Sequence, residues 1–230
     1  MPETLKINFK LYHIKDTSIK KYVIFVTNNM ANGDKIYRLL HYKNLLVRLK
    51  SIGFVKVFSD NLADSLEISP SLVRKDFREF GIRGAQKGGY TIETVLAKIN
   101  EVLGVDKKHK IIIVGAGRIG QALINYPGFS KDKIIIKAGF DSDPEKVNEE
   151  AEVPVMHINY LPEFVRKHGI KLAILTVPDN AALSSMDLLE EAGIKGVLNF
   201  TSLNLKRNAM AVNHVHIVNE IENLIFTITN

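Results

Sequence analysis

The chain has 230 residues, is 46% hydrophobic and carries a formal net charge of +6. This length allows one large domain or two small ones, with enough apolar material for a buried core. The absence of cysteine excludes disulfides and thiolate metal sites, and we expect a reducing cytoplasm as the location. No apolar run reaches the roughly 18 to 20 residues of a membrane span, and the start of the chain lacks a signal-peptide pattern. We therefore expect a chain that is neither inserted in a membrane nor exported.

The positive charge is concentrated in the first half of the chain. Lys and Arg outnumber Asp and Glu over residues 1–105, whereas the two groups are nearly balanced over 106–230. A basic part joined to a neutral one is typical of a chain with a polyanionic partner. An ordinary solvated surface explains the charge equally well.

The first 29 residues follow no clean helical or strand period and are rich in Lys, Ile, Asn, Phe and Tyr. We expect Met30 to be the natural start, which would make 1–29 a start-site artefact or a poorly ordered arm. An additional β-ribbon is the alternative.

Apolar spacing then predicts two helices in the basic part. The first covers 36–49 and has apolar residues at intervals of three and four: Ile36, Leu39, Tyr42, Leu46 and Leu49. We expect Ser59 to cap a short second helix over 60–67. One face of this helix carries Leu62, Ala63 and Leu66.

A third helix is predicted over 70–80. Ser69 provides an N-cap, Pro70 occupies the first helical position, where a missing N–H costs nothing, and Gly81 ends the helix. Its apolar face is expected to point to the core and consists of Leu72, Val73, Phe77 and Phe80. A polar, mostly cationic stripe runs along the opposite face: Ser71, Arg74, Lys75 and Arg78.

Two helices joined by a tight turn, with a basic outer face on the second, describe a helix-turn-helix that can enter the major groove of DNA. Arg can bond guanine O6 and N7 with two hydrogen bonds, and Lys and Ser can hold phosphates. The glycine-rich stretch "GIRGAQKGGYTI" follows, with Arg83 and Lys87 between the glycines. We interpret it as the wing of a winged helix, which would add Arg83 and Lys87 to the DNA-binding residues. A solvated helix face and a plain surface loop are the alternatives.

The second half contains a glycine pattern typical of dinucleotide binding. After the buried strand "IIIV", Gly115, Gly117 and Gly120 have the GxGxxG spacing and precede a helix, with Ala116, Arg118 and Ile119 between them. The first glycine makes the turn, the second lets the backbone approach a pyrophosphate, and the third lets helix and strand pack. Asp141 ends the next strand, about 20 residues later, where a carboxylate accepts the ribose hydroxyls. Because that acid would repel a 2′-phosphate and no Arg follows it, we expect NAD(H) in preference to NADP(H).

Strands and helices continue to alternate up to residue 200, which predicts a doubly wound parallel sheet. Ligands bind at the carboxyl ends of such strands. Further cofactor-binding candidates at these ends are therefore Thr176, Val177, Pro178 and Asn199. The chain closes with an apolar stripe that must be buried against its own domain or a partner: Ile217, Ile221, Leu224, Ile225 and Ile228.

The predicted fold is α/β, with an N-terminal winged helix-turn-helix domain over 30–105, a Rossmann-type domain over 106–212 and a C-terminal dimerisation helix over 213–230. Only some 30 residues follow the last predicted strand, too few for a substrate domain, and the seven histidines lack a metal-ligand spacing. We therefore expect no enzyme, no catalytic residue and no metal. A nucleotide-responsive DNA-binding switch fits both halves. A small NAD(H)-dependent reductase and a CoA-binding domain protein remain alternatives.

The motifs "LVRKDFREFG", "GGYTIETVLAKINEVLG", "VGAGRIGQALINYPGF", "GFDSDPEKV", "LAILTVP" and "AGIKGVLNF" resemble, in matching order from about Asp34 onward, the Rex family of redox-sensing transcriptional repressors. The resemblance implies a homodimer that reads operator DNA through winged helices and binds NAD(H), with the terminal helix swapped between protomers. NADH is expected to release the operator, and NAD+ to permit binding. By motif, Tyr126 in "NYPGF" would lie near the nicotinamide.

This sequence departs from the family pattern in the wing, which has "GAQKGGY" where the family tends toward a Lys-Arg-Gly tip, and at three further positions. Where the family often has Asp-Phe at the head of the terminal helix, the chain has His216 and Ile217, and Asn44 stands in place of a family Arg in the first helix. An Asp–Arg ion pair that reports the NADH state cannot form from these residues. We expect the chain still to discriminate the two redox forms, either more weakly or through other contacts.

Overall fold

The computed structural model describes residues 35–85 and 88–229 and divides into two compact units, 1–106 and 107–230. The expectations for residues 1–29 and for Lys87 lie outside the described residues. Each unit has a hydrophobic core of its own.

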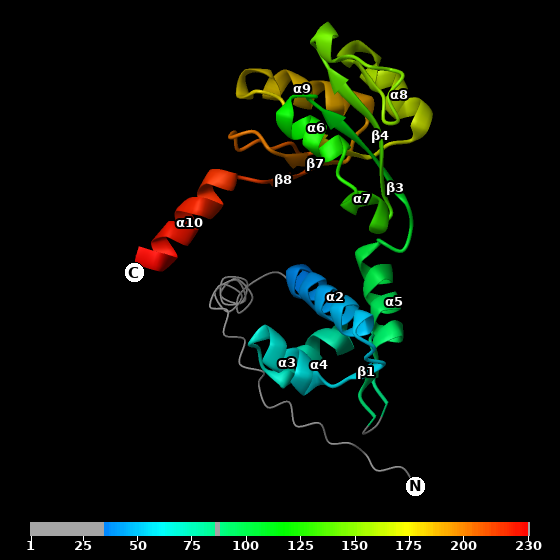
Figure 1. Cartoon of the computed structure of the whole chain (residues 1–230), viewed down its shortest axis with the longest axis vertical. Helices are drawn as coiled ribbons and strands as arrows, with labels where there is room; N and C mark the ends of the chain where they lie inside the picture. The colour runs from blue at the N-terminus through cyan, green and yellow to red at the C-terminus, as the bar shows by residue number, and fades with distance from the viewer. Residues whose placement is uncertain (1–34, 86–87, 230) are drawn as a thin grey trace. The chain divides into compact units, whose positions relative to one another are not determined.

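Among its described residues, the first unit contains four helices and a short antiparallel ribbon (Figure 1). Its helices are α2 (Lys35–Ser51), α3 (Ser59–Leu66), α4 (Pro70–Glu79) and α5 (Ile92–Leu103). The ribbon pairs β1 (Lys56–Val57) with β2 (Tyr90–Thr91). Side chains from all four helices form the core, among them Leu39, Tyr42, Leu46, Leu62, Val73, Phe77, Ile92 and Ile99.

The predicted start of α4 is confirmed. Ser69 is its N-cap and accepts a hydrogen bond from the Leu72 N–H at 3.2 Å, and Pro70 follows at the first position. Gly81 ends the segment with φ +71°, a conformation that favours glycine. The predicted cap of the preceding helix is wrong, because Ser59 is the first residue of α3 and Phe58 is its N-cap.

The apolar faces are also corrected in detail. Ile36 was predicted on the apolar face of the first helix but is 41% exposed, because the buried side chain in that turn of α2 is Arg38. On α4, Val73 and Phe77 are fully buried, whereas Leu72 and Phe80 are half-buried at its two ends. Asp76, which the apolar pattern excluded from this face, is buried with them.

The second unit contains a six-stranded, fully parallel sheet in the order β5-β4-β3-β6-β7-β8. The strands are β3 (His109–Val114), β4 (Ile134–Asp141), β5 (Val155–His157), β6 (Leu172–Leu175), β7 (Gly196–Asn199) and β8 (Ala211–His214). In chain order this is 3-2-1-4-5-6, the Rossmann arrangement, in which the chain reverses its direction of travel between β3 and β6. The predicted fold class is confirmed.

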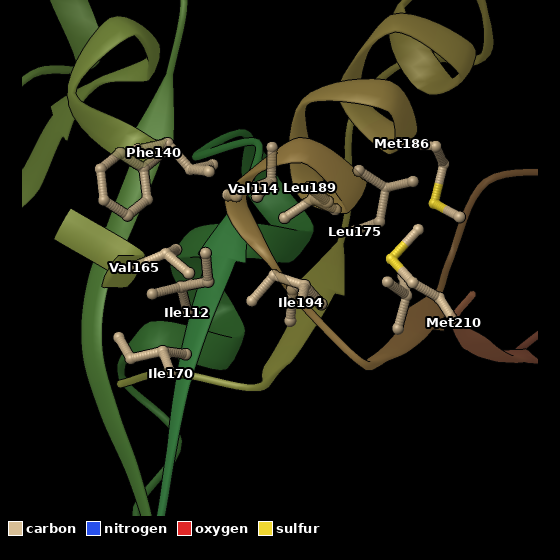
Figure 2. Close-up of a cluster of buried hydrophobic side chains, with 14 of the residues drawn as sticks. Ile112, Val114, Phe140, Val165, Ile170, Leu175, Met186, Leu189, Ile194 and Met210 are labelled. Atoms are coloured by element: carbon tan, nitrogen blue, oxygen red, sulfur yellow. The ribbon is translucent and has the colours of Figure 1, made fainter. Parts of the chain in front are cut away.

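Helices cover both faces of this sheet. On one face, α8 (Leu161–His168) and α9 (Asp179–Ala192) bury the larger core. Figure 2 shows this core, in which Phe140 and Val165 lie near Ile112, and Leu189 lies near Val114. The other face packs against α6 (Arg118–Ile124) and α7 (Gly128–Lys131), through Ile111, Ile113 and Ile174.

The last helix, α10 (Ile217–Thr229), follows β8 and contains no buried residue. Its apolar side chains are at least half exposed, from 50% for Leu224 to 67% for Phe226. Within 35–85 and 88–229, no helix is both long and apolar enough to cross a membrane.

Candidate functional site

The turn after β3 is packed so tightly that a Cβ atom at either of two of its glycines would collide with neighbouring backbone atoms. Gly115 has φ +96°, and a Cβ there would lie 2.7 Å from the Thr176 backbone. A Cβ on Gly120 would lie 1.9 Å from the Gly115 carbonyl oxygen. In contrast, a Cβ on Gly117 would meet nothing within 4 Å. Gly115 and Gly120 therefore pack the turn onto the sheet, whereas Gly117 lies on its open side, where a ligand can approach the backbone.

Hydrogen bonds hold this turn at the reversal point between β3 and β6. The Gly115 N–H donates to the Phe140 carbonyl at 2.8 Å, and the Thr176 N–H donates to the Val114 carbonyl at 2.8 Å. The Thr176 hydroxyl also donates to the Gly115 carbonyl at 2.7 Å. Thr176 thus acts from the end of β6 to fix the glycine turn. Arg118 and Ile119 are exposed at the start of α6, while Ala116 is buried.

Asp141 lies beside the turn, at the end of β4, and is 8% exposed. Its Oδ2 accepts a hydrogen bond from the Ala116 N–H at 2.7 Å, and its Oδ1 accepts one from the Asp143 N–H at 2.9 Å. Each carboxylate oxygen has a second lone pair that a ribose hydroxyl can use. The carboxylate that the sequence singled out is therefore held in place beside the turn.

Lys146 is a neighbour of this carboxylate that the sequence analysis missed. Its Nζ lies 3.6 Å from Asp141 Oδ2 and 3.4 Å from Asp143 Oδ2, and the negative charge of Asp141 raises the Lys146 pKa. The positive charge offsets the repulsion that Asp141 alone would exert on a 2′-phosphate. The electrostatic argument for NAD(H) over NADP(H) is therefore weaker than the sequence suggested.

The remaining candidates at strand ends differ in how accessible they are to a ligand. Val177 is half-buried and Pro178 is exposed, directly after Thr176. Asn199 is fully buried, and its amide nitrogen bonds the Leu203 carbonyl at 2.9 Å and His214 Nδ1 at 3.1 Å. Its Oδ1 accepts from the Thr201 N–H at 2.9 Å. The Asn199 side chain thus stabilises the loop after β7 and is not presented to a ligand.

Tyr126 does not belong to the glycine turn itself. It follows α6, is 56% exposed and packs edge-on against Phe129, with the ring centroids 5.3 Å apart. It lines a cavity of about 860 Å³ together with the first residues of β4, and no residue from Gly115 to Gly120 lines that cavity. Its expected position near a nicotinamide stays a prediction.

In the first unit, α4 presents the predicted polar stripe to solvent, since Ser71, Arg74, Lys75 and Arg78 are all exposed. Arg74 is partly engaged within the unit, because its Nη1 donates to Ser59 Oγ at 2.9 Å and lies 3.7 Å from Asp60 Oδ1.

A buried polar cluster on the other side of α4 was not predicted. Arg38 donates from Nε and Nη2 to the two oxygens of Asp76, both at 2.8 Å, and the Tyr42 hydroxyl donates to Asp76 Oδ2 at 2.9 Å. All three residues are at most 6% exposed. Burial and the charge of Asp76 raise the Tyr42 pKa, and the hydrogen bonds to Asp76 raise the Arg38 pKa. This cluster fixes the rotation of α4 against α2, and with it the direction of the cationic stripe.

The predicted wing corresponds to the segment between α4 and β2. The Ala85 N–H donates to the Gly89 carbonyl at 3.0 Å, and Gly89 has φ +68°, as a tight reversal requires. Arg83 is exposed on this segment. The ribbon partner of β2 is β1, a strand that the sequence analysis did not predict.

Comparisons with known proteins cover both units. A family model described as "CoA binding domain" matches residues 106–203. The redox-sensing transcriptional repressor Rex of Listeria welshimeri is 33% identical over 195 residues, covering 84% of this chain and 91% of its own. The corresponding protein of Thermosipho africanus is 37% identical over 194 residues, covering 84% and 93%. The chain belongs to the Rex family. The resemblance of the sequence motifs is thereby confirmed.

Solved structures of Rex family members agree with this assignment. RSP in complex with β-NAD+ and operator DNA matches with a TM-score of 0.80 and 30% identity, covering 84% of this chain and 90% of that one. RSP in complex with β-NADH matches with a TM-score of 0.76. This match covers 84% of the present chain and 92% of the RSP chain. The Rex relatives are named as repressors and not as enzymes, in agreement with the expectation from the missing substrate domain. Within 35–85 and 88–229, no group of three or more His, Cys, Asp or Glu side chains could hold a metal ion.

Proposed function

We propose that this chain is a cytoplasmic transcriptional repressor that binds operator DNA and responds to the NADH/NAD+ ratio. The observation that carries the proposal is the similarity to RSP, which extends over 84% of the chain and therefore includes both units. The RSP structures contain the two classes of ligand that the two units of this chain would bind, which are operator DNA and a nicotinamide dinucleotide.

In this proposal, the second unit holds NAD(H) over the glycine turn. The pyrophosphate approaches the backbone at Gly117, whose outer side is open, and Asp141 accepts the adenosine ribose hydroxyls. Thr176 keeps the turn in place, and Val177 and Pro178 border the nicotinamide end. Lys146 adds a positive charge beside the ribose position.

The first unit binds DNA through α4 and the wing. Lys75 and Arg78 are exposed, and neither forms an ion pair within the described part of the chain. Together with Ser71, Arg74 and Arg83 they form a cationic surface that suits phosphates and guanine edges. Lys87 is expected to extend this surface.

We further propose that the functional molecule is a homodimer held together by α10. A helix with seven large apolar side chains that are at least half exposed is stable in water only when a partner covers it. The sheet face that carries α6 and α7 also retains the half-buried Leu198 and Phe200 near its β7 end. Exchange of α10 between two copies would cover both apolar surfaces.

The glycine turn offers a direct test of nucleotide binding with a matched pair of variants. Gly117→Ala adds a methyl group in open space, so the free energy of unfolding should change by less than about 1 kcal/mol. The same methyl group occupies the approach path of the pyrophosphate, and NADH affinity should fall at least roughly tenfold, which is about 1.4 kcal/mol. Isothermal titration calorimetry with NADH and urea unfolding measure the two effects.

Gly120→Ala is the structural control, because its Cβ would collide with the Gly115 carbonyl. This variant should lose both stability and NADH binding. If Gly117→Ala binds NADH as tightly as the unmodified chain, the pyrophosphate does not lie over the turn and the proposed cofactor position is wrong.

The match to the CoA binding domain model makes CoA a competitor to test in the same experiment. CoA and NAD(H) share an adenosine diphosphate portion, which would need the same glycine turn. Higher affinity for CoA than for NADH and NAD+ would favour the CoA alternative.

A further inference from the structure

The second unit has a cavity that the proposed repressor mechanism does not use. It has a volume of about 860 Å³ and lies beside Ile134–Lys137, the first half of β4. On that side β5 pairs only with Gly139–Asp141, and no strand among the described residues pairs with the outer edge of Ile134–Lys137. The segment 151–155 forms the opposite wall. This volume lies within the range of roughly 300 to 1,000 Å³ that is typical of small-molecule sites.

One part of the cavity wall is apolar. Ile124 and Phe129 from the α6–α7 segment and Ile134 and Ile136 from β4 line it, and they pack on the same hydrophobic cluster of the sheet. Val153, Pro154 and Val155 add apolar surface from the facing segment. Such a wall stabilises a bound hydrocarbon chain by removing its surface from water.

The other part of the wall carries a lysine ammonium and a histidine ring. Lys137 and His168 line the cavity, and the His168 ring lies over the Phe164 ring with centroids 4.2 Å apart. Burial and then the positive charges of Lys137, Lys167 and Lys110 lower the His168 pKa. These three lysines form no ion pair with any carboxylate of the described residues. Glu152 is the carboxylate in the lining, and its side chain is exposed on the facing segment.

We propose that this cavity binds a medium-chain carboxylate, with its carboxylate at Lys137 and its hydrocarbon chain against Ile124, Ile134 and Ile136. The Lys137 ammonium forms no ion pair among the described residues, and it lies beside a hydrocarbon wall across from the exposed Glu152. This arrangement is complementary to an anion with an extended apolar body. None of the glycine-turn residues Gly115–Gly120, nor Asp141 or Thr176–Pro178, lines the cavity, whereas Tyr126, expected near the nicotinamide, does. The proposal therefore stands whether or not the glycine turn binds NAD(H).

Methyl NMR of the full chain tests this site, because isoleucine methyl groups report on it directly. Ile124, Ile134, Ile135 and Ile136 line the cavity, whereas Ile217, Ile221, Ile225 and Ile228 mark the exposed apolar face of α10. Titration with octanoate should shift the methyl signals of the first group and leave the second group unchanged. 1-Octanol has the same hydrocarbon chain without the charge and should bind roughly tenfold more weakly, because the charge-assisted contact to Lys137 is missing.

Lys137→Met should lower octanoate affinity to that of 1-octanol while retaining the NADH affinity of the unmodified chain. Lys195→Met is the matched control, because Lys195 is exposed on the same unit and does not line the cavity. The proposal is overturned if octanoate shifts only the α10 methyl signals or none, or if octanoate and 1-octanol bind the unmodified chain equally. The second comparison needs no variant, so it decides the matter even if Lys137→Met fails to fold.

Discussion

At the scale of single residues, the charged group with the largest structural role is Asp76. It lies on the core side of α4, 1% exposed, and three hydrogen bonds from Arg38 and Tyr42 compensate its charge. A buried pair of this kind adds little net stability compared with apolar packing, but loss of one partner leaves an uncompensated charge inside the protein.

Asp76→Ala should therefore lower the free energy of unfolding of the first unit by about 3 to 5 kcal/mol. Tyr42→Phe removes one hydrogen bond and keeps the ring packed against Phe77, so it should cost only about 1 kcal/mol. Urea unfolding of both variants provides the comparison. Equal, small losses would show that the cluster is not a compensated ion pair.

His41 makes the free energy of unfolding depend on pH, and the direction of its pKa shift gives the sign of that dependence. Burial lowers its pKa in the folded chain below the ordinary value, so the unfolded chain binds the proton more readily. Stability should then fall as the pH decreases from about 6.5, and this contribution should vanish above it. Replacement by His41→Gln should reduce the difference in unfolding free energy between about pH 8 and about pH 5. An unchanged difference would contradict the assignment.

At the scale of elements, α4 is the part of the first unit that the sequence predicted best. Ser69, Pro70 and Gly81 are local signals, and local signals fix the ends of a helix. The burial of Arg38 and Asp76 could not be predicted in the same way, because each charge is buried only through a partner 38 positions away. β1 was missed because two residues are too few to show a strand period.

The same contrast holds for the nucleotide site. The roles of Gly115, Gly117 and Gly120 follow from their spacing, since a tight turn depends on neighbouring residues. Lys146 was not predicted as a neighbour of Asp141 because its position depends on the turn that starts at Asp143. Asn199 was predicted to face a ligand because it lies at the end of a strand. Its amide instead bonds Leu203 and His214, and these contacts depend on the loop after β7 and on β8, which the position of Asn199 in the sequence does not reveal.

The cationic face of α4 yields a prediction for DNA binding. Arg78→Ala should weaken binding to the operator by about 1 to 3 kcal/mol, and NADH affinity should stay the same. Lys75→Ala should lower the affinity for operator DNA and for non-specific DNA to the same extent, and it should reduce the salt dependence of DNA binding. Fluorescence anisotropy at several salt concentrations measures both. Lys98→Ala on α5 serves as control, since Lys98 pairs with Glu101 and lies outside the stripe. Loss of NADH binding in Arg78→Ala would refute the division of labour between the units.

At the scale of the whole molecule, the proposed homodimer depends on α10. The sequence required its apolar stripe to be buried against its own domain or a partner, and the single chain buries none of it. Leu224→Glu should therefore convert the proposed homodimer to a monomer, as measured by light scattering coupled to gel filtration. Glu222→Gln changes an exposed polar residue of the same helix and should leave the dimer intact. A Leu224→Glu protein that remains dimeric would place the interface elsewhere.

The response to nucleotide depends on the whole assembly, and this chain lacks the Asp–Arg pair of its family. Asn44 is exposed on α2, and His216 stacks on His214 with ring centroids 5.5 Å apart, just before α10. His216 provides no carboxylate and Asn44 provides no guanidinium for such a pair. We predict that the chain still discriminates between the redox forms, more weakly or through contacts other than this pair.

The most direct test of the central claim is the affinity of the intact chain for its operator DNA, measured by anisotropy while NADH and NAD+ are titrated separately. The account predicts that NADH releases the DNA at concentrations at which NAD+ leaves it bound. Equal effects of the two nucleotides, or no effect of either, would contradict the proposal that this repressor senses the NADH/NAD+ ratio.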